Sequence, residues 1–331
     1  MPDSLTRRRA VQGSLAATTA AILPSSLLAQ AQVDELKILV GFPPGGTADV
    51  AARQLADKLA PSFARSAIVD NRPGAAGRIA IETLKTARPD GRTLLLTPAS
   101  TVTIYPTVYK RLSYNPETDV EPVSLACTFV HGFAVGPMVP EAVKTLADFA
   151  AWAKANPDKA NCGNPGEGSF PHFLSLVLAR GLGVAIQPVA YRGGAPGLAD
   201  MAAGQIAALL LPDGAFLPFT RTSRARVLAT SGTTRSKFHP DVATFAEQGV
   251  KDIVVTEWFG VFAPPGSPAA TVAATSEAIG KVLANPQVGE IFAQSGMVAR
   301  ATTPAELRAM MKVEADTWGP IIRSTGFQPL E

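Results

Sequence analysis

Strand-like and helix-like segments alternate along most of this chain, and that alternation limits the folds it can adopt. Residues 37–40 are expected to form a short buried strand, and apolar residues recur on one face of an expected helix that begins at Asp49. Residues 67–69 and 93–97 repeat the strand pattern, with a second helix expected between them over residues 77–87. Strands joined by helices in this way form a parallel sheet with helices on both faces. The sequence therefore predicts an α/β fold.

The same alternation starts again further along the chain. A helix is expected at residues 146–155 and another near Pro171, after a Gly-rich segment at 161–168. From Pro268 onward the chain is expected to be helical, with breaks at Asn285-Pro286 and Thr303-Pro304. Further strands are expected at residues 125–135, 186–191, 206–211, 227–230 and 253–262.

A chain of 331 residues is long for one hydrophobic core and sufficient for two. We therefore expect two doubly wound α/β domains around a ligand cleft. Domain 1 is expected to comprise residues 33–130 plus 257–331, and domain 2 residues 131–256. The chain would cross between them near residues 125–135 and 250–260, where long strands could serve both domains.

Residues 1–31 have the features of a signal peptide. Arg7, Arg8 and Arg9 precede a small, apolar stretch at 13–28, and Ala29-Gln30-Ala31 fits a cleavage site. Paired arginines favour the twin-arginine export route, and an ordinary Sec signal is the alternative. The apolar run is shorter than the roughly 20 residues that span a membrane. The sequence thus predicts a periplasmic protein.

Composition argues against nucleic-acid and metal sites. The net charge is +3, and the leader, with three arginines and one aspartate, carries most of it. No basic stripe with interleaved aromatic residues occurs, so no nucleic-acid partner is expected. The three histidines and two cysteines lack the spacing of a zinc site, and no cofactor is predicted. Cys127 and Cys162 could pair in an oxidising compartment or remain two buried thiols.

The loop at residues 41–49 is the first candidate ligand site. It joins the carboxyl end of a predicted strand to the amino end of a helix, the edge where open α/β sheets bind ligands. The unpaired N–H groups of a helix's first turn attract anions. Asp49 is expected to be the N-cap. The loop lacks the lysine of a Walker A motif, and a plain strand–helix turn is the alternative interpretation. The candidate binding residues here are Phe42, Pro44, Gly45, Gly46, Thr47, Ala48 and Asp49.

A second Gly-rich loop, residues 164–172, also precedes a helix and belongs to predicted domain 2. Its candidate binding residues are Gly166, Gly168, Ser169 and His172. Ser169 and His172 could instead suggest a nucleophile and its base, but a serine at a helix start is more often a cap. Arg192 lies in a further strand–helix loop and is expected either to line the cleft or to form a salt bridge at the hinge. Trp152, Trp258 and Trp318 are expected to be packing residues.

Eight short motifs in register resemble the Bug family, the extracytoplasmic solute receptors of tripartite tricarboxylate transporters. The family's opening pattern P-F-x-x-G-G-x-x-D-x-x-A-R is similar to residues 41–53, with Gly41 in place of the first proline. Its G-x-G-S/T-x-x-H motif is similar to residues 166–172. The other similar segments are residues 71–77, 90–95, 191–196, 240–249 (with Ala243 in place of a proline), 258–260 and 263–266.

The resemblance covers essentially the whole chain after the leader. It implies a periplasmic-binding-protein, or Venus-flytrap, architecture in which the two Gly-rich loops grip a carboxylate, partly through ordered waters. It further implies a receptor, not an enzyme, that is monomeric and delivers its ligand to two membrane subunits. Many relatives carry a polar or acidic residue soon after G-Q-V. Here residues 207–211 are apolar, which favours a plain or aromatic carboxylate over an amino acid.

Two other functions remain compatible with the residues. A sensor receptor would have the same fold and would signal to a membrane protein instead of a transporter. A secreted hydrolase that uses Ser169 as nucleophile is the enzymatic alternative.

Overall fold

The computed structural model describes residues 33–251 and 253–331, which belong to one compact unit, Gln32–Glu331. The expected signal peptide at residues 1–31 lies outside the described residues. In the described part of the chain, every helix is too short or too polar to cross a bilayer.

Ten strands of the described chain form a sheet in the order β2-β1-β3-β9-β4-β7-β5-β6, with β8 and β10 also paired to β4. Their bounds are β1 Val33–Val40, β2 Ala64–Asn71, β3 Thr93–Pro98, β4 Glu121–Val135, β5 Asn161–Asn164, β6 Gln187–Ala190, β7 Ala208–Pro212, β8 Arg226–Thr230, β9 Thr256–Ala263 and β10 Val298–Ala299. The α-helices are α1 Thr47–Leu59, α2 Arg78–Lys85, α3 Ala99–Thr103, α4 Tyr105–Val108, α5 Leu146–Ala155, α6 Phe170–Leu182, α7 Gly194–Ala202, α8 Leu217–Thr220, α9 Ala269–Leu283, α10 Pro286–Gln294 and α11 Pro304–Ser324. Short 3₁₀ turns are η1 Ala75–Gly77, η2 Pro157–Lys159 and η3 Asp213–Phe216.

The predicted parallel pairing is confirmed for β1 with β2 and β3, and for β5 with β6 and β7. At the centre of the sheet β9 runs antiparallel to both β3 and β4, a direction that the sequence analysis did not give. Strand β4 leaves the first group of strands in the same direction as β1 and β3, whereas β9 brings the chain back and therefore runs in the opposite direction.

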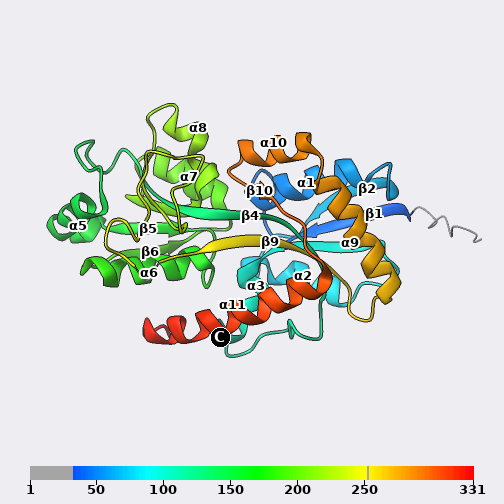
Figure 1. Cartoon of the computed structure of the whole chain (residues 1–331). Helices are drawn as coiled ribbons and strands as arrows, with labels where there is room; N and C mark the ends of the chain where they lie inside the picture. Colours follow the sequence, from blue (N-terminus) through cyan, green and yellow to red (C-terminus); the bar gives the residue numbers. More distant parts are fainter. Residues whose placement is uncertain (1–32, 252) are drawn as a thin grey trace, which may run out of the picture. The chain divides into compact units, whose positions relative to one another are not determined.

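Strand β4 links two groups of strands. It pairs with β9 as far as Val130 and with β7 from His131 onward. We call β1–β3, β9, β10 and the start of β4 the first half, and β5–β8 with the end of β4 the second half (Figure 1). The change of partner lies at the predicted boundary, but the division into two domains stays a prediction because residues 32–331 form one compact unit.

Side-chain alternation along the strands divides the core of the first half into two layers. Ile38 and Val40 pack in one hydrophobic cluster with α1, α9 and α10, whereas Leu39 packs in another with α2 and α11. Figure 1 shows the same arrangement, with α1, α9 and α10 on one face of the sheet and α2, α3 and α11 on the other. The period-2 pattern therefore produces the expected cover of helices on both faces.

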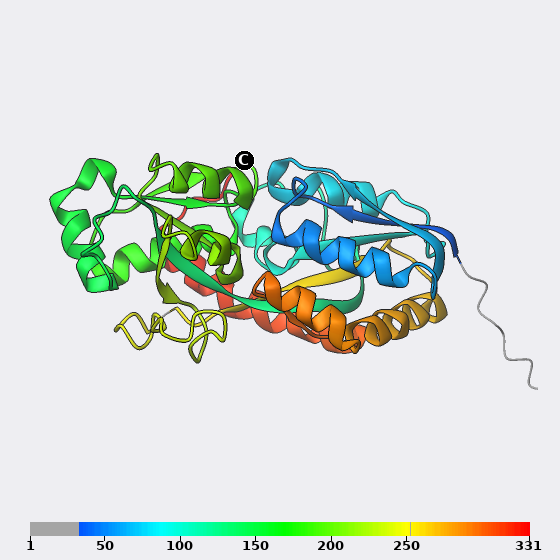
Figure 2. The same ribbon diagram turned by 90° about the horizontal axis from the view of Figure 1, so that it is seen from above.

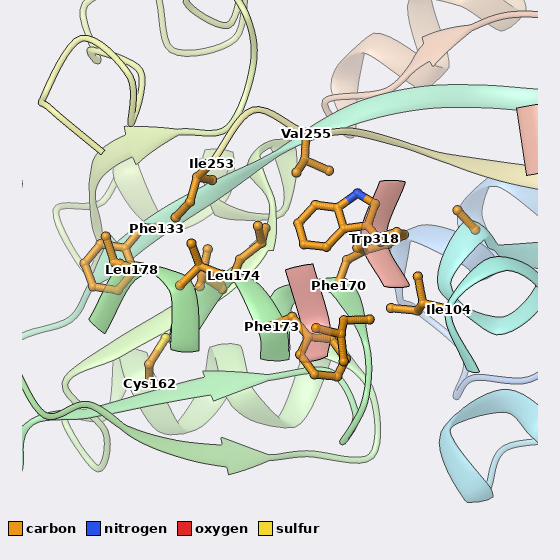
Figure 3. Packing of buried hydrophobic residues seen from close by; sticks show 14 of the residues in the cluster. Ile104, Phe133, Cys162, Phe170, Phe173, Leu174, Leu178, Ile253, Val255 and Trp318 are labelled. Carbon is orange, nitrogen blue, oxygen red and sulfur yellow. The ribbon is translucent and has the colours of Figure 1, made fainter. Parts of the chain in front are cut away.

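The hydrophobic cluster that contains Leu39 extends from the first half into the second. Phe170 of α6 packs edge-to-face on Trp318 of α11, with ring centroids 4.9 Å apart. Figure 3 shows these two rings between Ile104 on one side and Phe173 and Leu174 on the other. Trp258 belongs to the same cluster and Trp152 packs against it, so the three tryptophans are packing residues, as expected.

Most predicted boundaries are close to the observed ones, but several elements were missed. Helix α1 begins at Thr47, with Gly46 as N-cap, and not at Asp49. The short helices α3 and α4 and the strands β5 and β10 were not expected as such. Cys127 and Cys162 are both buried free thiols.

We expect Trp318→Ala to destabilise the protein by about 3–5 kcal/mol, because it removes a large buried ring from the cluster that joins the halves. Urea unfolding of the purified protein measures this loss. Trp152→Ala is the control, since Trp152 is only partly buried and should cost clearly less. Equal losses in the two variants would contradict the importance given to the Phe170–Trp318 contact.

Candidate functional site

A cavity of about 310 Å³ lies over the centre of the sheet, between loops of the first half and loops of the second. The first half contributes the β1–α1 loop and residues after β3. The second half contributes the loops that lead into α6 and α7, together with the segment from the end of β7 to α8. Figure 2, viewed from above, shows α1 and α10 beside the second half at this position. This is the sheet edge at which the sequence predicts ligand binding.

The floor of the cavity is one face of β4 and β9. Phe129 pairs across the strands with Glu257, so their side chains share a face, and His131 and Phe259 follow at i+2 on the same face. The Phe129 ring lies 4.7 Å from that of Phe259 and 5.7 Å from that of His131. The floor is therefore aromatic, with one acid and one histidine set into it.

His131 and Glu257 form a buried polar contact within this floor. The Nε2 atom of His131 lies 2.7 Å from Glu257 Oε2, but the contact is outside hydrogen-bond geometry, and Nδ1 has no hydrogen-bond partner in the described structure. Both side chains are almost fully buried. Burial, together with the charge of Glu257, raises the pKa of the nearby Glu314 carboxyl to about 8.

The β1–α1 loop is held by the side chain of Asp49, the third residue of α1. Its Oδ2 accepts from Gly45 N and from Arg53 Nε, both at 2.9 Å, and its Oδ1 accepts from Asn71 Nδ2 at 3.0 Å. Asn71 also donates to Phe42 O at 3.0 Å. Burial alone would raise the pKa of Asp49, but these hydrogen bonds and the Arg53 charge hold it below its usual value.

Asp49 is therefore not the N-cap that the sequence predicts. Gly46 occupies that position, and it has no side chain to satisfy the first-turn N–H groups. Thr47 and Ala48 line the cavity at this helix start. Unsatisfied N–H groups at the positive end of a helix dipole attract an anion. The loop thus places the uncapped start of α1 at the cavity.

The loop before α6 is held by the same kind of hydrogen bond, from a glycine N–H to a side chain of the following helix. His172, again the third helical residue, accepts at Nδ1 from Gly168 N at 3.0 Å, as Asp49 accepts from Gly45. Gly45 (φ 84°) and Gly168 (φ 80°) both adopt the left-handed conformation that favours glycine. Each loop is closed by the third side chain of the helix that follows it.

The donors of this second loop are largely used within the loop. Ser169 Oγ donates to Gly166 O at 2.6 Å, and Ser169 N donates to the same carbonyl. Gly166 N donates to Asn164 Oδ1 at 3.1 Å. Pro171, in the first turn of α6, has no N–H. The N–H groups of Phe170 and His172 at the start of α6 have no hydrogen-bond partner in the described structure, and Asn164 Nδ2 is buried without one, so this loop also leaves donors free.

The cavity lining contains seven of the twelve predicted binding residues: Phe42, Gly45, Gly46, Thr47, Ala48, Gly166 and Ser169. Pro44, Asp49, Gly168, His172 and Arg192 lie outside it. Asp49 and His172 act on loop shape, as described above. Arg192 is exposed, and among the described residues it forms no ion pair, so neither expected role is found.

The loops of the two halves touch one another around the cavity. Tyr109 Oη donates to Glu167 O at 3.3 Å, which joins α4 of the first half to the loop before α6. A Cβ on Gly193 would lie 3.1 Å from Pro43 Cδ, and one on Gly166 would lie 3.3 Å from Ala76 Cβ. The halves are therefore close together over the floor.

A sequence model of the tripartite tricarboxylate transporter family receptor matches residues 51–327. The chain belongs to this receptor family. Protein BugT of Bordetella pertussis is 30% identical over 324 residues, which cover 98% of this chain and 98% of BugT. The family was the one indicated by the motifs.

Solved receptors have the same fold. The structure of the periplasmic binding protein BugD gives a TM-score of 0.84 at 27% identity and covers 89% of this chain and 99% of BugD. A Rhodopseudomonas palustris protein solved with adipate gives 0.85 at 26% identity and covers 90% of this chain and 99% of that chain. These matches confirm the periplasmic-binding-protein architecture, and this receptor family consists of binding proteins.

The sequence analysis did not select the floor of this receptor's cavity. His131 and Glu257 stand within apolar strand segments, where a polar residue that is buried must face either a polar partner or a cavity. Their isolation in such strands was the available signal. It could not show that β4 and β9 are neighbours, which is what brings the two side chains together.

We expect acid to weaken the protein through His172. Burial lowers the pKa of His172 to about 4 from 6.5, so the unfolded chain binds a proton in that range while the folded chain does not. The stability that neutral His172 contributes is fully present above pH 6.5 and is lost as the pH falls to about 4. The free energy of unfolding should decrease by about 3 kcal/mol over this range.

Urea unfolding at several pH values tests this against His172→Asn, which keeps an acceptor for Gly168 N and does not titrate. The wild-type free energy of unfolding should fall relative to the variant between pH 6.5 and 4. Parallel curves over this range would show that His172 is not buried in its neutral form.

Proposed function

We propose that this protein is a periplasmic receptor that captures a small carboxylate and delivers it to the membrane subunits of a tripartite tricarboxylate transporter. One observation carries the proposal: the uncapped start of α1 opens into a cavity that both halves enclose. An anion placed there would accept from the N–H groups of Thr47 and Ala48. The adipate-bound relative supports the carboxylate as the anion.

The means of binding suits a receptor that must also release its ligand. In the described structure, no lysine or arginine lines the cavity, so main-chain N–H groups and the Thr47 hydroxyl would provide the attraction. These groups are fixed by Asp49 and its partners before the ligand arrives, which lowers the entropy cost of binding. Separation of the two halves would remove one wall of the site and free the ligand.

The hydrolase alternative is disfavoured by the contacts of its candidate residues. Ser169 Oγ donates to Gly166 O, and His172 Nδ1 accepts from Gly168 N, so each is engaged with the main chain. A histidine whose pKa is about 4 is also a weak base at neutral pH. We infer that the protein binds its ligand without chemical change.

The remaining parts of the proposal rest on the family and on the leader. Residues 1–31 would direct export, and the receptor would act as a monomer in the periplasm. Its membrane partners would be the subunits that the family description implies.

Gly46→Leu should abolish binding while leaving the fold intact. Gly46 has φ −79°, and the nearest atom to an added Cβ is Pro43 O at 3.7 Å, so the larger side chain fits the backbone but enters the cavity. A thermal-shift screen against succinate, adipate, hexanoate and benzoate measures binding. A ligand at a hundred times its Kd stabilises the wild type by about 2.7 kcal/mol.

Gly280→Leu is the matched control, because Gly280 lies on α9, away from the cavity, with open space around its Cβ position. It should keep the wild-type response. If Gly46→Leu responds to the same carboxylate as strongly as Gly280→Leu, the site lies elsewhere.

A further inference from the structure

We propose that His131 and Glu257 form a second recognition site in the cavity, which binds a hydroxyl or ammonium group carried by the carboxylate ligand. This inference rests on the proposed function and concerns the floor of the same cavity. It follows from two buried polar side chains that line the cavity and whose hydrogen-bonding capacity the protein itself does not use.

His131 is fully buried in β4, yet neither of its ring nitrogens has a hydrogen-bond partner in the described structure. The contact of 2.7 Å between Nε2 and Glu257 Oε2 lies outside hydrogen-bond geometry, so it does not satisfy the ring. Buried polar side chains normally bond to the protein or to ordered water. The imidazole, which can both donate and accept, is therefore free to bond to a group in the cavity.

Glu257 is the one acidic residue among the described residues that line the cavity. Its carboxylate has no hydrogen-bond or ion-pair partner in that part of the chain other than His131. The hydroxyl of Tyr105, which also lines the cavity, donates to Ala76 O at 2.9 Å instead. An ionised carboxylate accepts hydrogen bonds and donates none. The partner that Glu257 lacks is therefore a donor.

The surroundings of this pair make a missing partner costly. The Phe129 ring lies 5.7 Å from the His131 ring and 4.7 Å from that of Phe259, so aromatic surface flanks the polar groups. A plain acid that displaced water from His131 and Glu257 would leave them without hydrogen bonds. A ligand hydroxyl or ammonium would replace the water, because either group can donate to Glu257.

The two sites select different groups on one molecule. The start of α1 offers N–H groups to an anion, whereas Glu257 offers oxygen atoms to a donor. A cavity of about 310 Å³ suits one small ligand that spans both sites. The apolar segment 207–211 favoured a plain carboxylate in the sequence, but strand β9 provides the acidic residue that this segment lacks.

Isothermal titration of the purified protein with three matched series of acids tests the proposal. Within a series the carbon skeleton is constant and one position carries a hydrogen, a hydroxyl or an ammonium. The series are succinate, malate and aspartate; butyrate, 4-hydroxybutyrate and 4-aminobutyrate; and phenylacetate, mandelate and phenylglycine. Any co-purified ligand is first removed by unfolding and refolding. We expect the tightest binder to carry the hydroxyl or ammonium and to bind at least about tenfold more tightly than its plain acid, or about 1.4 kcal/mol.

The outcomes separate this inference from the proposed function. If no substituted acid exceeds its plain acid by this factor, the inference is overturned and the carboxylate receptor stands. The same holds if none of the nine acids binds but adipate, hexanoate or benzoate does. If none of these acids binds, the proposed function and the inference both fail.

Glu257→Met tests the assigned residue, since it removes the acceptor and keeps an unbranched side chain of similar length. The ratio of the two affinities, substituted acid over plain acid, should fall by at least about tenfold. Glu257→Gln distinguishes the two ligand groups, because an amide oxygen still accepts from a hydroxyl but lacks the charge that attracts an ammonium. The preference should therefore persist in Glu257→Gln for a hydroxyl and be lost for an ammonium.

Glu121→Met is the matched control, because Glu121 also lies on a central strand, β4, but pairs with Arg308 outside the cavity. It should leave the ratio of affinities unchanged. A purely structural role of the His131–Glu257 pair would lower the stability of the ligand-free protein without changing this ratio. An unchanged ratio in Glu257→Met would therefore overturn the proposal.

Discussion

Strand β4 is the constraint on which the rest of the arrangement depends. It is a single strand of 15 residues, buried along nearly all of its length, that pairs with β9 in one half and with β7 and β8 in the other. Strand β4 changes its pairing partner from β9 to β7 between Val130 and His131 and stays in the sheet. As a result, the loops at the carboxyl ends of the two groups of parallel strands face one another above it. The cavity, its floor and its two walls all follow from that one change of partner.

The two loops above this floor are built alike but differ in the residue that closes them. In both, a left-handed glycine donates its N–H to the third side chain of the following helix, Asp49 or His172. The charged Asp49 also binds Arg53 and Asn71, which fixes the loop while leaving the helix start open. The neutral His172 packs against the rings of Phe173 and Phe327, and in its loop Gly166 N and Ser169 Oγ donate to acceptors of the same loop. Similar motifs thus close two loops through residues of different charge, a carboxylate in the first and a neutral imidazole in the second.

The sequence supports the α/β class and both loops because each depends on local signals, namely strand–helix alternation and glycines before a helix start. The sequence could not predict that β9 pairs antiparallel with β3 and β4, because no local pattern indicates which distant strands are neighbours. Nor could it give the direction of a side chain: Asp49 was expected to face the ligand or cap the helix, and it turns into its own loop instead. His131 and Glu257 were missed for the same reason, because their importance arises from neighbouring strands.

The distance between the two halves is limited by main chain, not by flexible side chains. A Cβ on Gly214 of η3 would lie 2.2 Å from Gly296 Cα in the segment after α10, so only glycines allow this approach. Gly193 beside Pro43 and Gly166 beside Ala76 form similar contacts on the donor side of the cavity. Such contacts can stop closure at one spacing, because main-chain atoms cannot repack as side chains do. A cavity whose width is fixed in this way would select ligands by shape as well as by charge.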